Sequence, residues 1–328
     1  MKLLVVGGAG YIGSHMVKYL SLMGHNVTTF DNLSTGYQDA VKYGQFIEGD
    51  IADSASLNLI FSETQFDAVM HFASNIEVGE SVIDPGQYYK NNFSNTLNLL
   101  DAMVRHNVKK FIFSSTAAIF GEPSSDLIDE KHPTNPINPY GKSKLMVEHA
   151  LEDYELAHGL ESVCLRYFNA AGADIDGQLG ERHSPETHLI PLILQAASGR
   201  RDAIHIFGSD YNTIDGSCVR DYIHVLDLCS AHLLALNTLN QGSGSKRYNL
   251  GNGSGFSVIE VINAAKLITK KDFKVIHADR RKGDPATLVA DSMLAKSDLG
   301  WAPEYADLKT ILAHAWGWEK HLKEVVGS

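Results

Sequence analysis

The amino-acid sequence predicts an α/β fold: a Rossmann-type doubly wound parallel sheet, followed by a smaller α/β domain. Three observations support this prediction. Short apolar runs alternate with amphipathic helical segments through the first half, which is typical of a parallel sheet covered by helices on both faces. A glycine-rich turn joins the first apolar run to the first helical segment. The 328 residues exceed what one compact core normally holds, so we expect two domains, residues 1–168 and 169–328.

Each element of the first half has its own signal. The first helical segment ends at Gly24, and glycine is the usual residue after a helix. Asp53 or Ser54 caps the second helix, and Asn138-Pro139 supplies the cap and first residue of a later one. The predicted strands are residues 2–7, 26–31, 45–50, 66–73, 109–116 and 161–169, and the predicted helices are residues 10–24, 54–63, 88–108 and 139–158.

The pattern changes after Asn169. Residues 170–188 are rich in Gly, Asp and Pro and predict a long functional loop. Helices are then expected around residues 189–199, 225–240 and 257–270, with short strands between them. Some of these later segments can return to the first domain.

Composition and charge argue against several kinds of partner and location. The net charge of -11 argues against nucleic acid, which needs a basic face. No run of about 18 apolar residues predicts a membrane span, and the first apolar run leads directly into glycines, which predicts a strand rather than a signal peptide. Cys164, Cys218 and Cys229 are too scattered for a disulfide framework and suit a reducing cytoplasm. His183 and His188 lie in the loop without the His-Glu-x-x-His spacing, so we expect no metal.

The turn after the first strand predicts a dinucleotide site. Gly7, Gly10 and Gly13 allow a tight turn and close approach to a pyrophosphate, which the free amides at the helix N-terminus bind. Asp31 ends the second strand, where a carboxylate accepts hydrogen bonds from ribose hydroxyls and repels a 2′-phosphate. NAD is therefore favoured over NADP. Asp50-Ile51 lies at the end of the third strand and is expected to meet the adenine, although an ordinary polar strand end explains it equally well.

The helix after Asn138 carries a candidate catalytic pair. Tyr140 and Lys144 lie four residues apart and therefore share a face. A free tyrosine has a pKa near ~10, but a neighbouring ammonium and an oxidised nicotinamide would stabilise its phenolate. Tyr140 could then take a proton from a substrate hydroxyl while hydride leaves the same carbon, with the Thr116 hydroxyl beside these atoms. We expect Gly141 to leave room for the ligand. Taken alone, Tyr-x-x-x-Lys also occurs on helix surfaces without any function.

A series of motifs runs in order along nearly the whole chain: GGAGYIGSH, DNLSTG, HFAS with VGES, NN, SSTA, YGKSK, RYFNAAGA, ETHLIPL, IFGSDY, VRDYIHV and RKGDPATLVADS. By these motifs the chain resembles the UDP-hexose 4-epimerases of the extended short-chain dehydrogenase/reductase family. The resemblance includes second-domain motifs, which in that family bind the nucleotide sugar. It therefore implies a substrate-binding second domain as well as an NAD-binding first one.

The resemblance implies an activity and partners. NAD stays bound, Tyr140 deprotonates the sugar 4-hydroxyl, and hydride moves from C4 to the nicotinamide. The 4-keto sugar rotates while its UDP stays anchored, and hydride returns to the opposite face. UDP-galactose and UDP-glucose thus interconvert, as galactose metabolism requires. The family habit is a homodimer, with helices 88–108 and 140–158 as the expected contact surfaces.

The resemblance also assigns site residues. Catalytic roles fall to Tyr140, Lys144 and Thr116. Cofactor contacts are implied for Gly7, Gly10, Tyr11, Ile12, Gly13, Asp31, Asn32, Leu33, Ser34, Thr35, Gly36, Asp50, Ile51, Phe72, Ala73, Ser74, Asn91, Ser114, Tyr140, Lys144 and Phe168. Substrate contacts are implied for Thr116, Tyr140, Asn169, His188, Leu189, Phe207, Arg220, Arg281, Asp284 and Leu288. Arg220 and Arg281 correspond to diphosphate contacts and Asp284 to a ribose contact, although Arg220 could equally form a structural ion pair with Asp221.

Two positions vary within the family. Ile76 stands where some members have a lysine near the cofactor, so one cofactor contact is expected to weaken. Leu288 occupies the position that gates the hexose pocket, where tyrosine is associated with rejecting N-acetylated sugars and a small residue with accepting them. Leucine is intermediate, so a UDP-N-acetylglucosamine 4-epimerase stays open as the alternative.

Other functions on this scaffold fit less well. A nucleotide-sugar 4,6-dehydratase carries an Asp-Glu pair directly after the threonine, where this chain has Ala117-Ala118. A uronic-acid epimerase or decarboxylase would want added positive charge near the sugar, and no extra arginine stands at matching positions. A non-catalytic NAD-binding scaffold would typically lack Tyr140 or Lys144.

Overall fold

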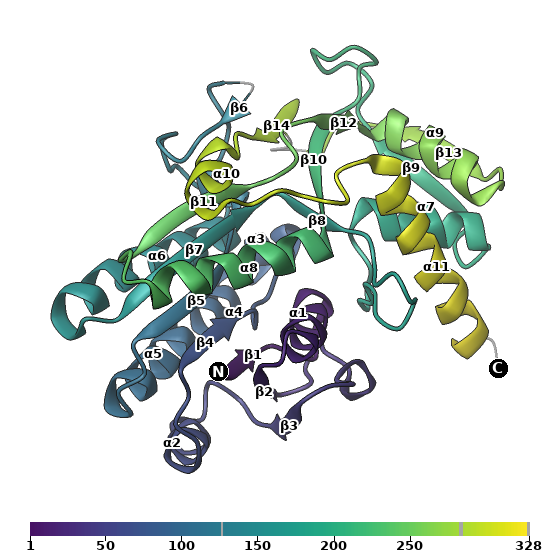
Figure 1. The fold of residues 1–328 in the computed structure, drawn as a ribbon. Helices are drawn as coiled ribbons and strands as arrows, with labels where there is room; N and C mark the ends of the chain where they lie inside the picture. The colour runs from purple at the N-terminus through teal and green to yellow at the C-terminus, as the bar shows by residue number, and fades with distance from the viewer. Residues whose placement is uncertain (126, 282–284, 327–328) are drawn as a thin grey trace.

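The structure is a computed structural model that describes residues 1–125, 127–281 and 285–326. A seven-stranded parallel sheet forms its larger part, with the strand order β11-β7-β5-β4-β1-β2-β3 (Figure 1). Its strands are β1 (Lys2–Val6), β2 (Asn26–Asp31), β3 (Gln45–Glu48), β4 (Ala68–His71), β5 (Lys110–Thr116), β7 (Glu161–Tyr167) and β11 (Lys246–Leu250). The strand order reverses at β1, which lies between β2 and β4. This confirms the predicted Rossmann-type doubly wound sheet.

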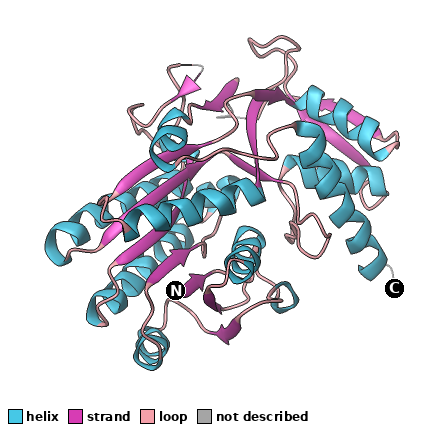
Figure 2. Cartoon of the chain, viewed as in Figure 1, coloured by secondary structure: helices cyan, strands magenta, loops and turns pink. Residues whose placement is uncertain are grey.

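Helices cover both faces of this sheet (Figure 2). One face carries α1 (Tyr11–Leu22) and α8 (Val225–Asn240), and the other carries α2 (Ser54–Glu63), α5 (Asn95–Arg105) and α6 (Pro139–His158). Side chains alternate along β1, so Leu3 and Val5 join the first core cluster while Leu4 and Val6 join the second. Both faces are therefore buried, which explains the continuous apolar run at the start of the chain.

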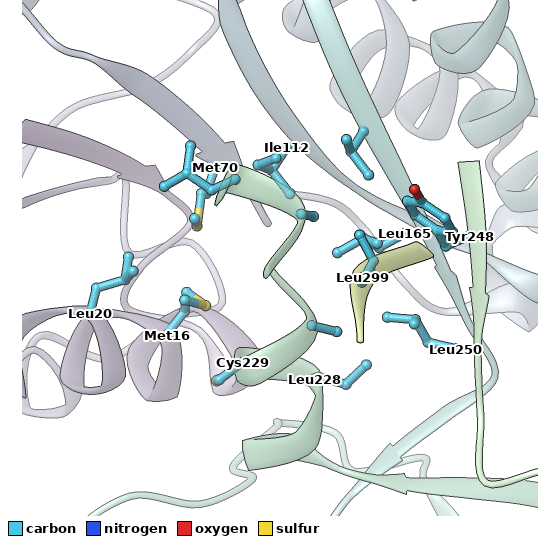
Figure 3. Packing of buried hydrophobic residues seen from close by; sticks show 14 of the residues in the cluster. Met16, Leu20, Met70, Ile112, Leu165, Leu228, Cys229, Tyr248, Leu250 and Leu299 are labelled. Atoms are coloured by element: carbon cyan, nitrogen blue, oxygen red, sulfur yellow. The ribbon is translucent and has the colours of Figure 1, made fainter. Parts of the chain in front are cut away.

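The first core cluster joins distant parts of the sequence. Figure 3 shows Met16 and Leu20 of α1 on one side, Leu228 of α8 beside them, and Met70 and Ile112 from the central strands. All five side chains are fully buried. Burial of one such side chain contributes about 1.5–3 kcal/mol, so α8 is held firmly to a sheet that begins more than two hundred residues earlier.

The long helix predicted over residues 88–108 is interrupted. After α3 (Val78–Ile83), the chain forms α4 (Pro85–Tyr88), a π-helical turn over Tyr89–Ser94, and then α5. A π-helical turn often marks a functional position in a helix. Here it carries Asn91, one of the expected cofactor contacts.

The remaining elements form the smaller part. Strand β10 (Val219–His224) pairs with β8 (Asn169–Ala171), β12 (Gly255–Ser257) and β14 (Thr287–Ala290), and β14 pairs with β6 (Leu127–Ile128). Strands β9 (Ala203–Phe207) and β13 (Lys274–Ala278) form a separate pair. Beside them pack α7 (Leu189–Ser198), α9 (Val258–Thr269) and α11 (Leu308–Val326). The short α10 (Met293–Leu299) lies against α8 and β11 instead.

A single border near residue 168 does not separate the two parts of the fold. Both α8 and β11 come from the second half, yet they complete the seven-stranded sheet. The predicted strand over residues 161–169 divides into β7 and β8, which belong to different sheets. None of the helices in the described residues is both long and apolar enough to cross a membrane.

Candidate active site

The glycine turn places bare backbone at the carboxyl ends of β1 and β4. Gly7 has φ +80°, and a Cβ there would lie 2.4 Å from the amide nitrogen of Ala73, which follows β4. A Cβ on Gly13 would lie 2.1 Å from the Gly7 carbonyl oxygen. Gly10 caps α1 without any side-chain bond, so the first amides of that helix face the crevice. This arrangement suits a pyrophosphate, because the tight turn brings backbone amides at the start of a helix to the end of the strand.

Acidic groups lie at the ends of β2 and β3. Asp31 is buried, and its carboxylate accepts hydrogen bonds from the amides of Ala9 and Leu33, each 2.9 Å long. Burial raises the pKa of Asp31, and these two bonds oppose the rise. Asn32 donates to Asp50 over 2.8 Å, which ties the two predicted cofactor segments together. Strand β3 ends at Glu48, so Asp50 lies in the following turn rather than in the strand as predicted.

The other expected cofactor residues lie in or directly after the same elements. Ile51 is buried behind Asp50, and Gly36 packs so closely that a Cβ would lie 2.9 Å from Ala9. The side chain of Tyr11 points away to the second half, where its hydroxyl donates to the Gly172 carbonyl over 2.7 Å. Ile12 lies in α1, Leu33, Ser34 and Thr35 follow β2, and Phe72 and Ser74 follow β4.

Tyr140 lies in the first turn of α6. Asn138 caps this helix by accepting a hydrogen bond from the Gly141 amide over 2.8 Å, as the sequence predicts. Burial raises the pKa of the Tyr140 phenol, and a hydrogen bond with Thr116 at the end of β5 opposes that rise. The structure therefore brings the predicted Tyr140–Thr116 pair together. The sequence analysis expected Lys144 and an oxidised nicotinamide together to stabilise the phenolate, and that expectation stays a prediction.

Lys144 lies one turn later and is buried. Its amine donates to the Ser74 hydroxyl over 2.6 Å and to the Ser114 carbonyl over 2.8 Å, and it lies 4.9 Å from the centroid of the Phe113 ring. Burial lowers the pKa of Lys144 to about 7. The amine thus connects the segment after β4 with β5, the two elements that border the crevice.

Gly141 has a different role from the expected one. A Cβ at this position would lie 2.4 Å from the Ala118 carbonyl oxygen. The glycine therefore allows α6 to pack against the 3₁₀ turn Ala117–Phe120 that follows Thr116. It leaves room for protein backbone rather than for a ligand.

The sequence analysis missed two supports of the candidate catalytic residues. Asn92 is buried and binds both backbone groups of Asn75 over 2.8 and 3.0 Å and the hydroxyl of Ser143 over 3.2 Å. Asn91, the residue that was named instead, donates to Asn92 and Asn75. The repeated asparagine in the motif NN was the only signal for this role.

The second support is a buried ion pair. Glu148, one turn beyond Lys144, pairs with Arg166 of β7 over 2.6 Å and accepts a hydrogen bond from Ser115. Both side chains are almost fully buried. The pair fixes α6 against β5 and β7, and nothing in the local sequence links its two members.

Apart from Thr116 and Tyr140, the expected substrate residues that the structure describes belong to the second half of the chain, from Asn169 onward. Register pairs Arg220 of β10 with Leu288 of β14, and Asn169 of β8 donates to the Asp221 carbonyl over 2.9 Å. Leu288 and Phe168 pack against the cluster that contains Ala117. The candidate hexose gate therefore lies directly beside the segment that follows Thr116.

The arginine positions are now defined. Arg220 donates to the carbonyls of Val219 and Pro285, each over 2.9 Å. The suggested Arg220–Asp221 ion pair is wrong, because the Asp221 carboxylate accepts the amides of Asn252, Gly253 and Ala290. Arg281 stacks on the Phe207 ring at 3.9 Å, which joins two expected substrate residues. Asp284 lies outside the described residues, and His188 caps α7 directly before Leu189.

A contact across the molecule borders the glycine turn. Arg182 stacks on Tyr37 with 3.5 Å between the guanidinium and the ring centroid, and it also pairs with Asp39. Together with Gly180 and Trp318, Arg182 lines one side of a cleft whose other side includes Gly10, Tyr11, Ser14 and Thr35. The loop over residues 170–188 thus reaches the expected cofactor segment.

Fold and site together define a class of protein: a dinucleotide-dependent enzyme with a Tyr-x-x-x-Lys pair beside a second, polar binding region. Comparison with known proteins agrees, since the sequence model of the NAD dependent epimerase/dehydratase family matches residues 3–251. The chain is 52% identical to the UDP-glucose 4-epimerase of Halalkalibacterium halodurans over 320 residues, or 98% of this chain and 96% of that protein. It is 50% identical to that of Rhizobium meliloti, over 97% of this chain and 96% of the relative.

Solved structures give the same result. The structure of UDP-glucose 4-epimerase from Brucella ovis in complex with NAD matches with a TM-score of 0.95 and 49% identity, covering 97% of this chain and 98% of that one. The chain therefore belongs to the NAD dependent epimerase/dehydratase family.

Proposed function

We propose that this protein is a UDP-glucose 4-epimerase that uses bound NAD to interconvert UDP-galactose and UDP-glucose. The observation that carries the proposal is the position of Tyr140, which bonds with Thr116 at the end of β5, one turn before Lys144. Relatives named UDP-glucose 4-epimerase at 50–52% identity over nearly the whole chain support it.

Tyr140 and Lys144 divide the work at the reacting end. Tyr140 takes the proton of the hexose 4-hydroxyl and later returns it, while Thr116 orients the phenol oxygen. Bound NAD would supply a hydride acceptor and donor for C4, and its oxidised ring would add positive charge beside the phenol. That charge is needed because burial alone raises the pKa of Tyr140. Lys144 holds the ribose next to the nicotinamide, and its contacts to Ser74 and Ser114 orient the amine.

The smaller part anchors the nucleotide. Arg220 and Arg281 bind the diphosphate, because guanidinium groups offer forked, permanently charged donors. Asn169, the backbone around His188 and Leu189, and the stretch at Phe207 bind the rest of UDP, with Asp284 at the uridine ribose. Firm contacts to UDP and loose ones to the hexose allow the 4-keto sugar to rotate and present its other face.

In this proposal the chain forms two binding units. Residues 1–168, completed by α8 and β11, form the NAD-binding unit. Most of residues 169–328 form the nucleotide-sugar-binding unit. The cofactor contacts are those that the resemblance implies, from Gly7 in the glycine turn to Phe168 after β7.

The protein acts in the cytoplasm as a homodimer in this proposal. Its three cysteines are unpaired and buried, as suits a reducing compartment. The α5 and α6 surfaces are the expected contact, and α6 exposes Leu156 and Met146. Sedimentation at several concentrations checks the dimer, and a purely monomeric protein would contradict it.

A UDP-N-acetylglucosamine 4-epimerase is the alternative. Leu288 packs beside the 3₁₀ turn after Thr116, and its side chain is smaller than the tyrosine associated with exclusion of N-acetyl groups. Separate incubations with UDP-galactose and UDP-N-acetylgalactosamine, with products resolved by chromatography, distinguish the two substrates.

The decisive experiment replaces Tyr140 by phenylalanine. Tyr140→Phe keeps the ring but removes the proton acceptor, so turnover of UDP-galactose should fall by at least about 10²-fold, as expected for loss of a general acid–base group. Fold and NAD content should stay unchanged by circular dichroism and cofactor extraction. Near-normal turnover in this variant would refute the proposal.

A further inference from the structure

Four potential metal ligands converge in the loop between β8 and α7. They are Glu181, His183, Glu186 and His188, and their ligand atoms all lie within 4.8 Å of one another. Two imidazoles and two carboxylates come together within a stretch of eight residues. The sequence analysis expected no metal here, because the spacing matches no simple helical motif.

The two carboxylates are buried beside each other. Each of the Glu181 and Glu186 side chains is only 5% exposed. Over the part of the chain that the structure describes, the ion-pair partners of both are His183 and His188, and neither carboxylate pairs with a lysine or arginine. Two buried carboxylates need compensating positive charge, which either protonated His183 and His188 or one divalent cation at a single point can supply.

The position of His183 indicates where such an ion would lie. Its Nδ1 atom is buried and makes no hydrogen bond in the structure. It faces Glu181 Oε1 at 3.4 Å and Glu186 Oε2 at 3.5 Å. These separations are those of neighbouring ligands around one tetrahedral ion, since metal–ligand bonds of about 2.0–2.2 Å place the ligands roughly 3.4 Å apart.

We propose that Glu181, His183, Glu186 and His188 bind one divalent transition-metal ion of the zinc type. Imidazole nitrogen with carboxylate oxygen suits zinc and its first-row neighbours, whereas Mg²⁺ and Ca²⁺ prefer ligand sets made of oxygen. The His188 side chain is 45% exposed, so an ion can enter from solvent on that side.

A bound ion would link the two ends of this loop segment, Glu181 and His188, to each other. The Glu181 carbonyl accepts a hydrogen bond from the Trp318 indole of α11 over 2.9 Å, and His188 caps α7. Glu186 already accepts the amides of Thr187 and His188 at the start of that helix. A bound ion would therefore fasten the loop to α7 and α11 and stabilise the folded state.

The test uses full-length protein without a histidine tag, in its NAD-bound form. After chelator treatment and desalting, we expect titration with Zn²⁺ to show one ion per chain and to raise the thermal midpoint, whereas Mg²⁺ does neither. Co²⁺ should give the visible absorption of a four-coordinate site. The readouts are independent of epimerase activity, so they stand whether or not the proposed function holds.

Two variants and a control locate the ion. His183→Asn should weaken Zn²⁺ binding by at least about tenfold, the loss seen when even a supporting residue of a metal site is removed, and Glu186→Gln should do the same. His149→Asn, on the exposed side of α6, should bind Zn²⁺ like the wild type. Absence of stoichiometric Zn²⁺ binding, or equal binding by His183→Asn and wild type with unchanged circular dichroism, would overturn the proposal.

Discussion

Burial decides the protonation of the two central side chains. It raises the pKa of Tyr140 and lowers the pKa of Lys144 to about 7, so it favours the neutral form of each. Hydrogen bonds orient both groups. Thr116 bonds with the phenol, and Ser74 and Ser114 accept from the amine. A positive charge placed next to Tyr140 would therefore lower the raised pKa of its phenol toward neutral pH.

Arg281 offers a test of nucleotide anchoring. Arg281→Ala removes a charged, exposed side chain that stacks on Phe207. Because a diphosphate contact serves the ground state and the transition state alike, KM for UDP-galactose should rise about tenfold or more while kcat changes little. Steady-state kinetics checks this, with Arg280→Ala as the neighbouring control because Arg280 pairs with Asp210 instead. An unchanged KM would argue against the diphosphate role.

His71 predicts a dependence of stability on pH. It is buried at the end of β4 and bonds Thr96 over 3.0 Å, and burial together with the charge of Lys144 lowers its pKa to about 3. Because the folded-state pKa of His71 lies below its ordinary value, the unfolded chain takes up a proton first as the pH falls. The contribution of His71 to the free energy of unfolding is therefore fully present above about pH 6.5 and is lost below it. From pH 7.5 to 5.5 the wild type should lose about 1.4 kcal/mol relative to His71→Phe.

Chemical denaturation of both proteins at these two pH values measures that difference. The comparison cancels the other titrating groups, since both chains carry them. A wild type that gains stability relative to His71→Phe on acidification would show that the histidine is charged in the folded state.

Helix α6 illustrates how one element acquires a fixed position. Asn138 caps it, Gly141 lets it approach Ala118, and Glu148 anchors it to Arg166. These three devices lie along one helix that also carries Tyr140 and Lys144. The positions of these two candidate catalytic side chains are thus set by the placement of the whole helix rather than by contacts with each other.

Removing the anchor of α6 should loosen it. Glu148→Gln leaves Arg166 as a buried charge without a carboxylate, which costs about 3–5 kcal/mol, and kcat should fall because Tyr140 is less well placed. Urea denaturation and steady-state kinetics check both effects. Glu152→Gln is the matched control, because Glu152 pairs with Arg247 at the exposed surface and should change stability by only about 0–1 kcal/mol. Equal stability of the two variants would contradict the anchoring role.

The molecule is held together by contacts that cross between its halves. Lys18 of α1 pairs with Asp174 over 2.8 Å with both side chains buried, and Tyr11 bonds the Gly172 carbonyl. Arg182 reaches Tyr37 from the same loop. The loop over residues 170–188 therefore connects the glycine turn of the larger part to α7 and α11 of the smaller part.

The Lys18–Asp174 pair tests this connection. Lys18→Ala leaves Asp174 buried without its partner and should lower the free energy of unfolding by about 3 kcal/mol. The double variant Lys18→Met with Asp174→Leu should recover most of this loss, because an apolar pair of similar size replaces the ion pair. Thermal and urea unfolding of the three proteins measure the effect. A double variant no more stable than Lys18→Ala would refute the explanation.

Local patterns predicted much of the fold. The bounds of β2 and α8 match the predicted ranges, and the caps of α2 and α6 are the expected Asp53 and Asn138. Such features depend on residues a few positions apart, which the sequence displays directly. The interruption of the long helix by a π-helical turn was missed, because its periodicity differs from that of an α-helix over one turn only.

The spacing of Tyr140 and Lys144 and the glycine turn beside Asp31 were determined by the sequence, since helix and turn geometry is local. Only the tertiary structure decided that Lys144 bonds Ser74 and Ser114, that Gly141 admits Ala118, and that α8 and β11 complete the first sheet. Each of these depends on which distant segments pack together. That choice follows from the burial of apolar surface over the whole chain, which no short stretch of sequence encodes.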